Sequence, residues 1–355
     1  MYHAISPGRE WLDTEGKPIQ AHGGSVIYVK DRYYWYGENK EKTDGKNGIW
    51  HWGVRCYSSE DLYNWMDEGL IIPPTPEDET SPLHPSACMD RPHILFNEQT
   101  GKFVCWLKIM EKDGRQTETV LTADRILGPY TMVKTGLMPL GMSAGDFDLA
   151  VDENGKAYYF FDKVHSELIC AELTEDYTDI SGVYSRHFPR SQPPYVREAV
   201  AHFERGGLHY LITSGTTGYL PNPSELAVSE SWHGPYRLLD DPHPLDKSRT
   251  SFHSQISCVF KVWGKEDLYI AIADRWLPDR MDLNYEDYAE WFRIRFSPKP
   301  TEEELARAEE LGKHLPADGD ISTSQARYVW LPLRFDGKQA VIDWRDEWTI
   351  EGIDT

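Results

Sequence analysis

Four polar side chains recur at similar places along the sequence, each near the start of a short apolar run. Asp90, Asp146, Glu198 and Gln255 follow one another at steps of about 56, 52 and 57 residues, and Gly23 takes the matching place about 67 residues earlier. Radial repetition with this period would bring the five positions together near one axis. Two carboxylates facing each other across a polar cleft are the usual apparatus for hydrolysing a glycosidic bond, so these side chains are candidates for a reaction centre.

Glu198 is the candidate general acid. It precedes the apolar run at residues 199–201, and an apolar setting raises the pKa of a carboxyl group so that it holds a proton near neutral pH. The alternative is an ion pair with Arg197. Asp146 lies two residues before Asp148, so an extended strand turns both toward one face, where one of them can tune the pKa of Glu198. The alternative for either aspartate is a turn cap at the start of the strand.

Asp90 is a candidate for binding a sugar hydroxyl or orienting water, and the alternative is a surface ion pair with a nearby arginine. Its neighbour Arg91 precedes Pro92, which favours extended backbone at Arg91. Gln255 cannot act as a base near neutral pH, but its carbonyl oxygen can position a water molecule. His22 is a candidate contact for substrate, an axial water or an ion, although an ordinary hydrogen-bonded histidine is the favoured interpretation.

The sequence contains no motif that indicates metal or nucleotide binding. It contains no HExxH zinc motif and no Gly-rich phosphate loop. We expect no catalytic metal and no cofactor, and the sequence leaves open a structural ion on the central axis.

The elements that would position these residues recur five times. Each unit begins with a short strand and continues about a dozen residues later with an aromatic-rich strand. The segments NEQTGK, DENGK and ERGG lie between the first two strands of three units and predict β-hairpins. The tripeptide Gly-Pro-Tyr at 128–130 returns at 234–236, at a comparable place in its unit.

The repeat predicts an all-β fold, a five-bladed β-propeller, as a single domain over residues 1–355. The expected blades span roughly residues 21–73, 88–139, 144–190, 196–241 and 252–345. One segment departs from the strand pattern: TEEELARAEELGKHL from Thr301 has a capping-box start and helical spacing of its apolar residues. We therefore predict a short helical insertion in the last blade.

The net charge of −21, from 58 acidic and 37 basic residues, limits the partners. A negative far field repels phosphate backbones and anionic lipid, so we expect neither nucleic acid nor a membrane as partner. The first residues lack a basic region followed by an apolar stretch, and no apolar run of about 18 residues occurs. We expect a cytoplasmic protein, or a secreted one if a leader has been removed; the oligomeric state is not indicated.

At these same residues the chain resembles glycoside hydrolase family 43, whose members are five-bladed β-propeller enzymes that act by inversion. The resemblance covers nearly all of residues 21–333 and is closest to the branch that contains exo-β-1,3-galactanases. The motifs that carry it are AHGG with YYWYGE, RP after an acidic residue, REA, SGTTGY with PN, SQ, ADRW and YVWLPL.

The resemblance implies roles for the candidate residues. It makes Glu198 the general acid, Asp146 the residue that tunes and orients it, and Gln255 the holder of the attacking water. The aspartate base usual in the first blade is replaced by His-Gly-Gly at 22–24. Asp90 stands where the branch has a glutamate and is implied as a substitute base or a sugar ligand.

Further positions match sugar contacts of that branch. Tyr219 replaces a tryptophan and keeps a smaller stacking face. Arg115 and Gln116 lie where the pattern has a sugar-contacting tyrosine. The implied galactose contacts are Glu38, Thr217 and Asn222.

These observations predict an inverting glycoside hydrolase that releases a terminal sugar, β-galactose by the resemblance, from a short oligosaccharide. Activity as an α-L-arabinofuranosidase or β-xylosidase on the same fold is an alternative. A glycoside phosphorylase is another, because Arg91, Arg197 and Arg275 could bind phosphate bidentately, and Arg275 is also a candidate substrate contact. A non-catalytic sugar-binding propeller is the last alternative, because the usual base is missing.

Overall fold

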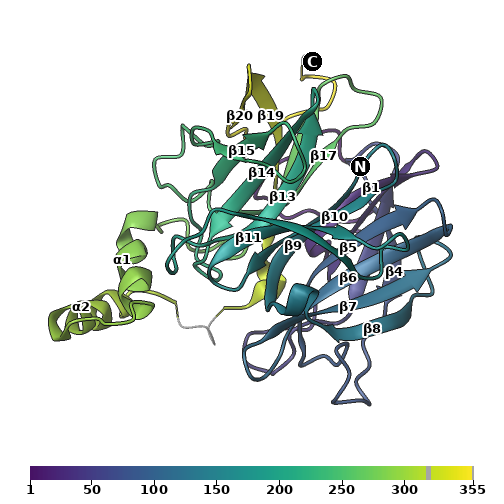
Figure 1. Cartoon of the computed structure of the whole chain (residues 1–355). Coiled ribbons are helices and arrows are strands. Elements are labelled where there is room, and N and C mark those ends of the chain that lie inside the picture. Colours follow the sequence, from purple (N-terminus) through teal and green to yellow (C-terminus); the bar gives the residue numbers. More distant parts are fainter. Residues whose placement is uncertain (317–320, 354–355) are drawn as a thin grey trace.

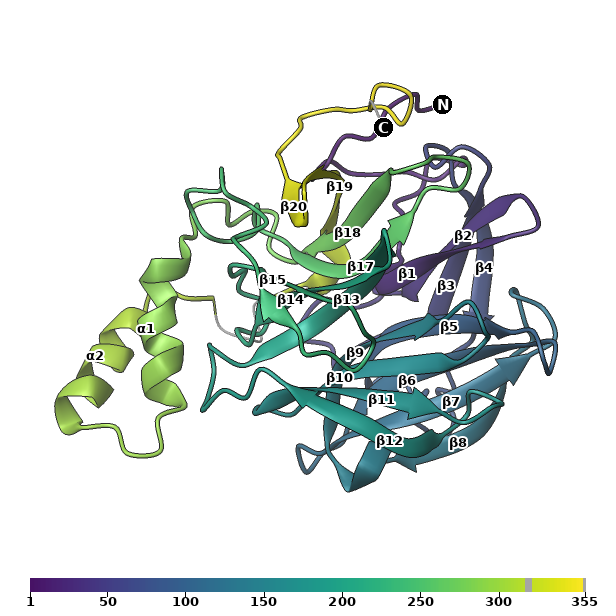
Figure 2. The ribbon, with the colours of Figure 1, turned by 45° about the horizontal axis from the view of Figure 1, so that its top comes forward.

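The computed structural model describes residues 1–316 and 321–353. Its strands form five four-stranded antiparallel sheets, in each of which the strands lie in sequence order. The first strand of every sheet neighbours the first strands of two other sheets, so β1, β5, β9, β13 and β17 close a ring. Figure 1 and Figure 2 show the sheets arranged around this common centre. The predicted five-bladed β-propeller is confirmed.

The elements have the following bounds. The first blade consists of β1 His22–Val29, β2 Arg32–Glu38, β3 Val54–Ser59 and β4 Met66–Ile72. The second consists of β5 Cys88–Asn97, β6 Lys102–Met110, β7 Gln116–Ala123 and β8 Thr131–Leu137. The third consists of β9 Ala144–Val151, β10 Ala157–Lys163, β11 Glu167–Leu173 and β12 Ile180–His187. The fourth consists of β13 Arg197–Arg205, β14 Leu208–Gly215, β15 Glu225–Ser229 and β16 Arg237–Leu238. The fifth consists of β17 Gln255–Lys261, β18 Tyr269–Arg275, β19 Arg327–Asp336 and β20 Gln339–Ile342. Short 3₁₀ turns occupy Pro139–Gly141 and Thr323–Gln325.

Every inner strand contains an extra residue near its start. Residues 23–24, 91–92, 145–146 and 199–200 each lie opposite a single residue of the next strand. In β17 the extra residue is Ser257. A β-bulge of this kind bends the strand and re-aims the side chains beside it, here at the end of the ring where the strands begin.

The bulges correct the alignment expected from the sequence. Asp90, Glu198 and Gln255 are equivalent, because each lies three positions before the first paired residue after the bulge of its strand. The first and third blades place His22 and Ala144 there, rather than the predicted Gly23 and Asp146. The predicted alignment is wrong in these two blades, because the extra residue of a bulge shifts the strand register but does not change the apolar pattern of the sequence.

Two helices, α1 (Tyr285–Arg295) and α2 (Glu302–Gly312), are inserted between β18 and β19 and project from one side of the propeller (Figure 1). The predicted insertion is confirmed, and α2 begins at the expected capping box, in which Thr301 and Glu304 each accept a hydrogen bond from the other's backbone N–H. The sequence did not predict α1, which has no side-chain N-cap. Its residue Tyr288 is fully buried, so tertiary packing rather than a local signal specifies this helix.

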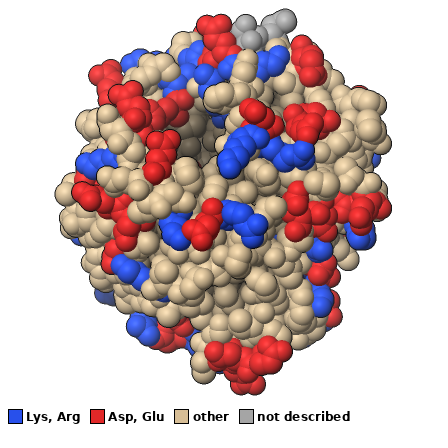
Figure 3. All heavy atoms as spheres, turned by 90° about the vertical axis from the view of Figure 1, so that its right-hand side faces the viewer, with Lys and Arg blue, Asp and Glu red and all other residues tan. Residues whose placement is uncertain are grey.

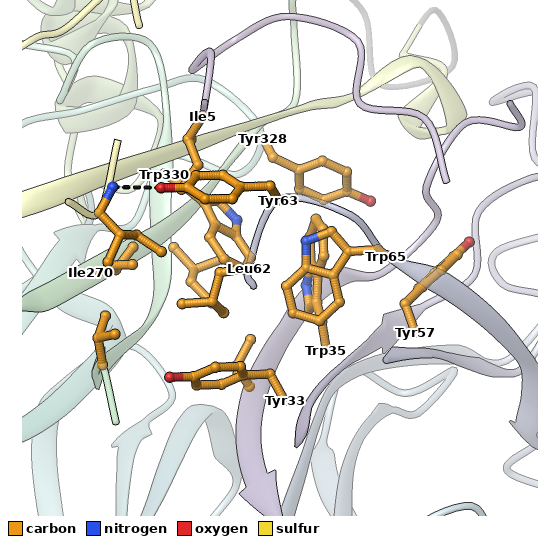
Figure 4. Close-up of a cluster of buried hydrophobic side chains, with 14 of the residues drawn as sticks. Ile5, Tyr33, Trp35, Tyr57, Leu62, Tyr63, Trp65, Ile270, Tyr328 and Trp330 are labelled. Carbon is orange, nitrogen blue, oxygen red and sulfur yellow. Dashed lines mark hydrogen bonds between the residues drawn. The ribbon is translucent and has the colours of Figure 1, made fainter. Parts of the chain in front are cut away.

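The largest buried cluster joins the blades that close the ring. Trp35 and Trp65 of the first blade lie edge-on to Trp330 of the fifth, with ring centroids 4.7 and 5.8 Å from it, and all three are fully buried. Figure 4 shows these rings meeting. The N-terminal segment adds a strap, because Ile5 forms an isolated antiparallel bridge with Trp348, which follows β20. The cluster and the strap together hold the first and last blades against each other.

The surface carries both signs of charge. Figure 3 shows acidic and basic side chains interspersed over one face of the molecule, which is hollowed near its upper part. Within residues 1–316 and 321–353 no helix is long and apolar enough to cross a membrane.

The tryptophan cluster makes a stability prediction. Replacing Trp35 by Ala should lower the free energy of unfolding by about 3–5 kcal/mol, because a large, fully buried ring is lost and a cavity remains. Denaturant unfolding followed by circular dichroism measures the change. The control is Trp263→Ala, whose side chain is 67% exposed and which should change stability by less than about 0.5 kcal/mol. Equal effects of the two substitutions would show that the cluster does not hold the ring closed.

Candidate active site

Two cations, the buried Arg91 and the mostly covered Lys108, connect candidate residues from different blades. Arg91 Nη2 lies 2.9 Å from Asp146 Oδ2 and 3.0 Å from Gln255 Oε1. Lys108 Nζ lies 2.6 Å from Asp146 Oδ1 and 3.3 Å from Asp90 Oδ2. The structure therefore brings Asp90, Asp146 and Gln255, from the second, third and fifth blades, into one centre.

Glu198 joins this centre from the fourth blade. It lies opposite Ser214 in the β13–β14 pair, and Ser214 Oγ accepts a hydrogen bond of 2.9 Å from Gln255 Nε2. Burial, followed by the negative charge of Asp146, raises the pKa of Glu198 to about 8. The alternative of an ion pair with Arg197 is wrong, because that guanidinium lies 3.6 Å from the carboxylate of Glu225 and donates to the side chain and carbonyl oxygen of Thr213. Glu198 therefore keeps its proton at neutral pH.

Asp146 is held ionised beside it. Burial opposes ionisation, but Arg91 and Lys108 outweigh burial and lower the pKa of Asp146. One carboxyl group of the centre thus carries a proton at neutral pH while its neighbour carries a charge. Two carboxyl groups whose pKa values are pushed apart by their surroundings are the arrangement that divides acid and base roles. Asp148 is separate from this pair, since it binds His93 and the backbone N–H of His202.

Asp90 is held by three side chains that no sequence motif indicates. Trp50 Nε1 donates to its Oδ1 over 2.7 Å, and Lys40 Nζ and Lys108 Nζ lie 3.9 and 3.3 Å from its carboxylate. Burial opposes ionisation, but the two lysines and Trp50 lower the pKa of Asp90. The alternative of a surface pair with an arginine is wrong, because the partners are lysines and the side chain is only 16% exposed.

Glu38 is a further carboxyl group close to Asp90. Its Oε1 accepts a 3.0 Å hydrogen bond from the backbone N–H of Arg91, and its Oε2 lies 2.7 Å from Lys40 Nζ. Burial raises the pKa of Glu38 to about 7, although Lys40 acts in the opposite direction. Arg91 has a φ of 54°, so the extended backbone expected before Pro92 is wrong; the bulge at this point imposes the left-handed conformation.

Gln255 is fixed at both ends of its amide group. Oε1 accepts from Arg91 Nη2 at 3.0 Å and from Trp276 Nε1 at 3.3 Å, while Nε2 donates to Ser214. A carbonyl oxygen has two lone pairs, and here each has a donor. A water molecule held by this oxygen has to replace one of the two bonds, and the longer one comes from Trp276.

Three aromatic rings form a wall beside the centre. The ring of Tyr219 lies 5.4 Å from that of Trp276 and 6.4 Å from that of Trp50, measured between centroids. A pocket lined by Tyr219, Trp276, Gln255 and Asn222, among others, has a volume of about 10 Å³, which holds about one water molecule. Flat aromatic faces with polar edges of this kind suit a sugar ring. Tyr219 was predicted from the sequence, whereas Trp50 and Trp276 were not, because their positions depend on loops from other blades.

Two predicted substrate contacts serve the protein itself. His22 is fully buried, with Nδ1 2.9 Å from Asp274 Oδ1 and Nε2 3.4 Å from the Tyr328 hydroxyl, as the favoured interpretation of an ordinary histidine expects. Arg275 donates to the Phe252 carbonyl and lies so close to Gly8 that a Cβ there would come within 2.2 Å of its Nη1.

The three arginines considered for phosphate binding do not form one site. Arg91 binds Asp146 and Gln255, whereas Arg197 binds Thr213. Arg275 shares none of these hydrogen-bond partners in the part of the chain that the structure describes. The arrangement therefore does not favour the phosphorylase alternative.

Two acids behind Asp146 were also missed. Burial raises the pKa of Glu118 and of Asp162 well above the usual range, and Tyr159 donates a hydrogen bond of 2.8 Å to Glu118. Gly145 makes room for Asp162, because a Cβ at that glycine would lie 2.3 Å from the carboxylate. For Asp162 the available signal was a carboxylate directly after the apolar run of its strand, AYYFFDK.

Other chemistries lack the required geometry. Residues 141–145, Gly-Met-Ser-Ala-Gly, have the letters of a GxSxG nucleophile elbow, but an elbow needs a strand-to-helix turn, and here strand β9 follows at Ala144. Ser143 Oγ instead accepts the Gln116 N–H. Among the residues that the structure describes, no group of three or more His, Cys, Asp or Glu side chains could hold a metal ion.

The chain resembles proteins of known family. The family model "Glycosyl hydrolases family 43" matches residues 17–258. A solved family 43 β-1,3-galactosidase superposes with a TM-score of 0.77 at 30% identity, covering 98% of this chain and 63% of that one. A second β-1,3-galactosidase of the family, solved with galactodeoxynojirimycin, has a TM-score of 0.77 at 27% identity and covers 98% of this chain and 100% of the other.

A more distant solved structure has the same fold, and one curated protein matches by sequence. An exo-β-1,3-galactanase from Phanerochaete chrysosporium, solved with galactose, has a TM-score of 0.76 at 23% identity. The match covers 98% of this chain and 69% of the galactanase chain. Among curated proteins, a candidate β-xylosidase of Escherichia coli (strain K12) is 27% identical over 225 residues, which are 58% of this chain and 38% of that protein. This chain thus spans less than two thirds of the curated relative and of the first galactosidase.

The coupling between Asp146 and Glu198 can be measured directly. Replacing Asp146 by Asn should lower the pKa of Glu198 by on the order of one unit, because a neighbouring negative charge is lost and Arg91 and Lys108 are left uncompensated. Carbon-13 NMR titration of the glutamate carboxyl groups measures the shift. Asp152→Asn, in the turn after β9, is the control and should leave this pKa unchanged. A pKa that stays near 8 in Asp146→Asn would contradict the coupling.

Proposed function

The chain belongs to glycosyl hydrolases family 43, an inverting family of glycoside hydrolases, and from this premise we propose that it releases terminal β-galactose from an oligosaccharide. The observation that carries the proposal is the protonated Glu198 next to the ionised Asp146 in a centre lined by aromatic rings. The two relatives named β-1,3-galactosidases favour galactose as the sugar.

In the proposed reaction, Glu198 donates its proton to the glycosidic oxygen as the bond from that oxygen to the anomeric carbon breaks. A water molecule attacks the anomeric carbon from the opposite face, so that the configuration inverts. The water oxygen and one hydrogen remain on the released sugar, and a carboxylate of the protein accepts the other proton. Asp90 is the ionised carboxylate that we propose as its acceptor, with Gln255 positioning the water.

The surrounding residues have supporting roles in this proposal. Asp146 keeps the pKa of Glu198 high and does not itself exchange a proton with the substrate. Glu38 and Tyr219 are the proposed sugar contacts, Glu38 through a carboxyl group beside Asp90 and Tyr219 through its ring. Thr217, Asn222 and His22 have their polar side-chain atoms engaged within the protein, and the guanidinium of Arg275 donates to the Phe252 carbonyl oxygen. None of the four is proposed to bind the sugar directly.

β-Xylosidase activity is the second candidate, favoured by the curated relative. Xylose lacks the hydroxymethyl group of galactose, so the two activities differ in whether the site accepts that group. A panel of nitrophenyl β-galactoside, β-xyloside and α-L-arabinofuranoside, together with β-1,3-galacto-oligosaccharides, separates them. Hydrolysis of the xyloside but not the galactosides would overturn the galactosidase proposal.

Glu198→Gln tests the acid. The substitution should lower kcat/KM on an oligosaccharide by about 10²- to 10⁴-fold, because the amide cannot supply the proton. The loss should be smaller on a dinitrophenyl galactoside, whose leaving group needs little protonation. Proton NMR of the first product should show inverted configuration in the wild type. Glu204 is an exposed glutamate of the same strand, so Glu204→Gln is the matched control and should keep full activity. A first product with retained anomeric configuration, or equal losses of activity on both substrates, would contradict the role of Glu198 as the acid.

The pH profile follows from the same group. Because Glu198 must be protonated to act, kcat/KM should fall as the pH rises through about 8, the pKa of this carboxyl group. Initial rates between pH 5 and 10, with stability checked at each pH, measure this alkaline limb. Asp146→Asn should move the limb to lower pH, whereas a limb that stays in place would assign the titration to another residue.

A further inference from the structure

The loop at residues 215–222 is a tight turn bonded to itself. The N–H of Gly215 donates to Asn222 Oδ1 over 2.6 Å, and Asn222 Nδ2 donates to the Gly215 carbonyl and to Thr217 Oγ1 over 2.9 and 2.7 Å. Thr217 Oγ1 in turn donates to the Leu220 carbonyl. Thr217 and Asn222 therefore give the loop its shape.

The same loop is fixed from outside by helix α1. Tyr288 of α1 is fully buried, and its hydroxyl donates to the carbonyl oxygen of Pro221. Leu220 packs in one apolar cluster with Tyr288, Phe292 and Leu283. The C-terminal turn of the helix is tied down separately, by a 2.8 Å hydrogen bond from Gln192 to the backbone of α1.

Tyr219 lies directly before these two anchored residues. The loop carries its ring away from the fourth blade to Trp276 of the fifth and Trp50 of the first. Its hydroxyl is close enough to Asp90 and Glu38 for their charges to raise the pKa of Tyr219, after the larger effect of burial. The place of this ring in the wall thus depends on the turn that carries it and on the helix behind that turn.

We propose that helix α1 is a substrate-positioning element and that Tyr288, through Pro221 and Leu220, sets the place of the Tyr219 ring against the sugar. The inference rests on the proposed function in that Tyr219 contacts the sugar. Within the described residues, Tyr288 makes no hydrogen bond to Glu198, Asp146 or Gln255. Loosening the helix should therefore weaken sugar binding and leave the chemical step unchanged.

Tyr288→Phe is the decisive variant, because it removes one hydrogen bond and keeps the buried ring. We expect KM to rise about five-fold with kcat nearly unchanged, as for the loss of one hydrogen bond. Hydrogen–deuterium exchange of the 215–222 peptide, measured without substrate, should become faster. The control is Tyr285→Phe on the same helix, whose hydroxyl has no hydrogen-bond partner among the described residues; KM and exchange should stay at wild-type values.

Leu220→Ala gives a second test from the loop side and should act in the same direction, because it removes the apolar anchor. Thermal unfolding of each variant checks that the propeller remains folded. Unchanged exchange in both variants, or a fall in kcat with KM constant, would overturn the inference. If the wild type hydrolyses no glycoside of the panel, the proposed function fails. The affinity for galactose, measured by calorimetry, then replaces KM. An affinity of Tyr288→Phe equal to that of the wild type would overturn the inference separately.

Discussion

One guanidinium group connects most of the candidate active site. Arg91 bonds Asp146 and Gln255 through its side chain and Glu38 through its backbone N–H, so a residue of the second blade is tied to the third, fifth and first blades at once. A buried cation is tolerated only when it is paired and hydrogen-bonded, because its desolvation is otherwise uncompensated. The requirement is mutual. Arg91 and Lys108 keep Asp146 ionised, and the charge of Asp146 in turn compensates the two cations for their loss of contact with water.

The repeated bulge explains how five similar blades produce a centre of unlike residues. Residues with left-handed backbone, Gly23, Arg91 and Ala199, follow the equivalent positions of the first, second and fourth blades. A non-glycine residue in this conformation costs about 1–2 kcal/mol and persists where surrounding contacts over-determine it. At Arg91 those contacts are the hydrogen bonds of its backbone and side chain; at Ala199 they are the complete burial of the residue and its neighbour Val200. The backbone strain thus lies at the bulges that direct the neighbouring side chains, Asp90 and Glu198, toward the centre.

The sequence was sufficient for the architecture, because apolar strands and turn tripeptides recur along it, and it pointed to candidate site residues because a polar residue recurs near the start of four of the five units. It was insufficient for the partners of those residues. Lys40 and Trp50 reach Asp90 from the loop after β2 of the first blade, and no local pattern specifies which loop of a neighbouring blade meets a given strand. Lys108 lies opposite Asp90 in the β5–β6 pair of the same blade, but the register of that pair depends on the bulge. Helix α1 was missed for the same reason, since its stability comes from burial of Tyr288 rather than from a cap or a strong apolar stripe. The alignment error at Gly23 and Asp146 came from bulges, which change register by one residue at a time.

The bridge between Ile5 and Trp348 sets an order of events for the molecule's assembly. It joins residues more than three hundred positions apart, and the tryptophan cluster beneath it likewise needs residues from both ends of the chain. During synthesis, the first blade therefore emerges with the apolar face around Trp35 uncovered and waits for the fifth blade. Contacts of such high sequence separation fold slowly, and an exposed sheet that waits for its partner is open to mispairing. For this protein, the vulnerable interval in the cell is the time between the appearance of the first blade and the arrival of the last.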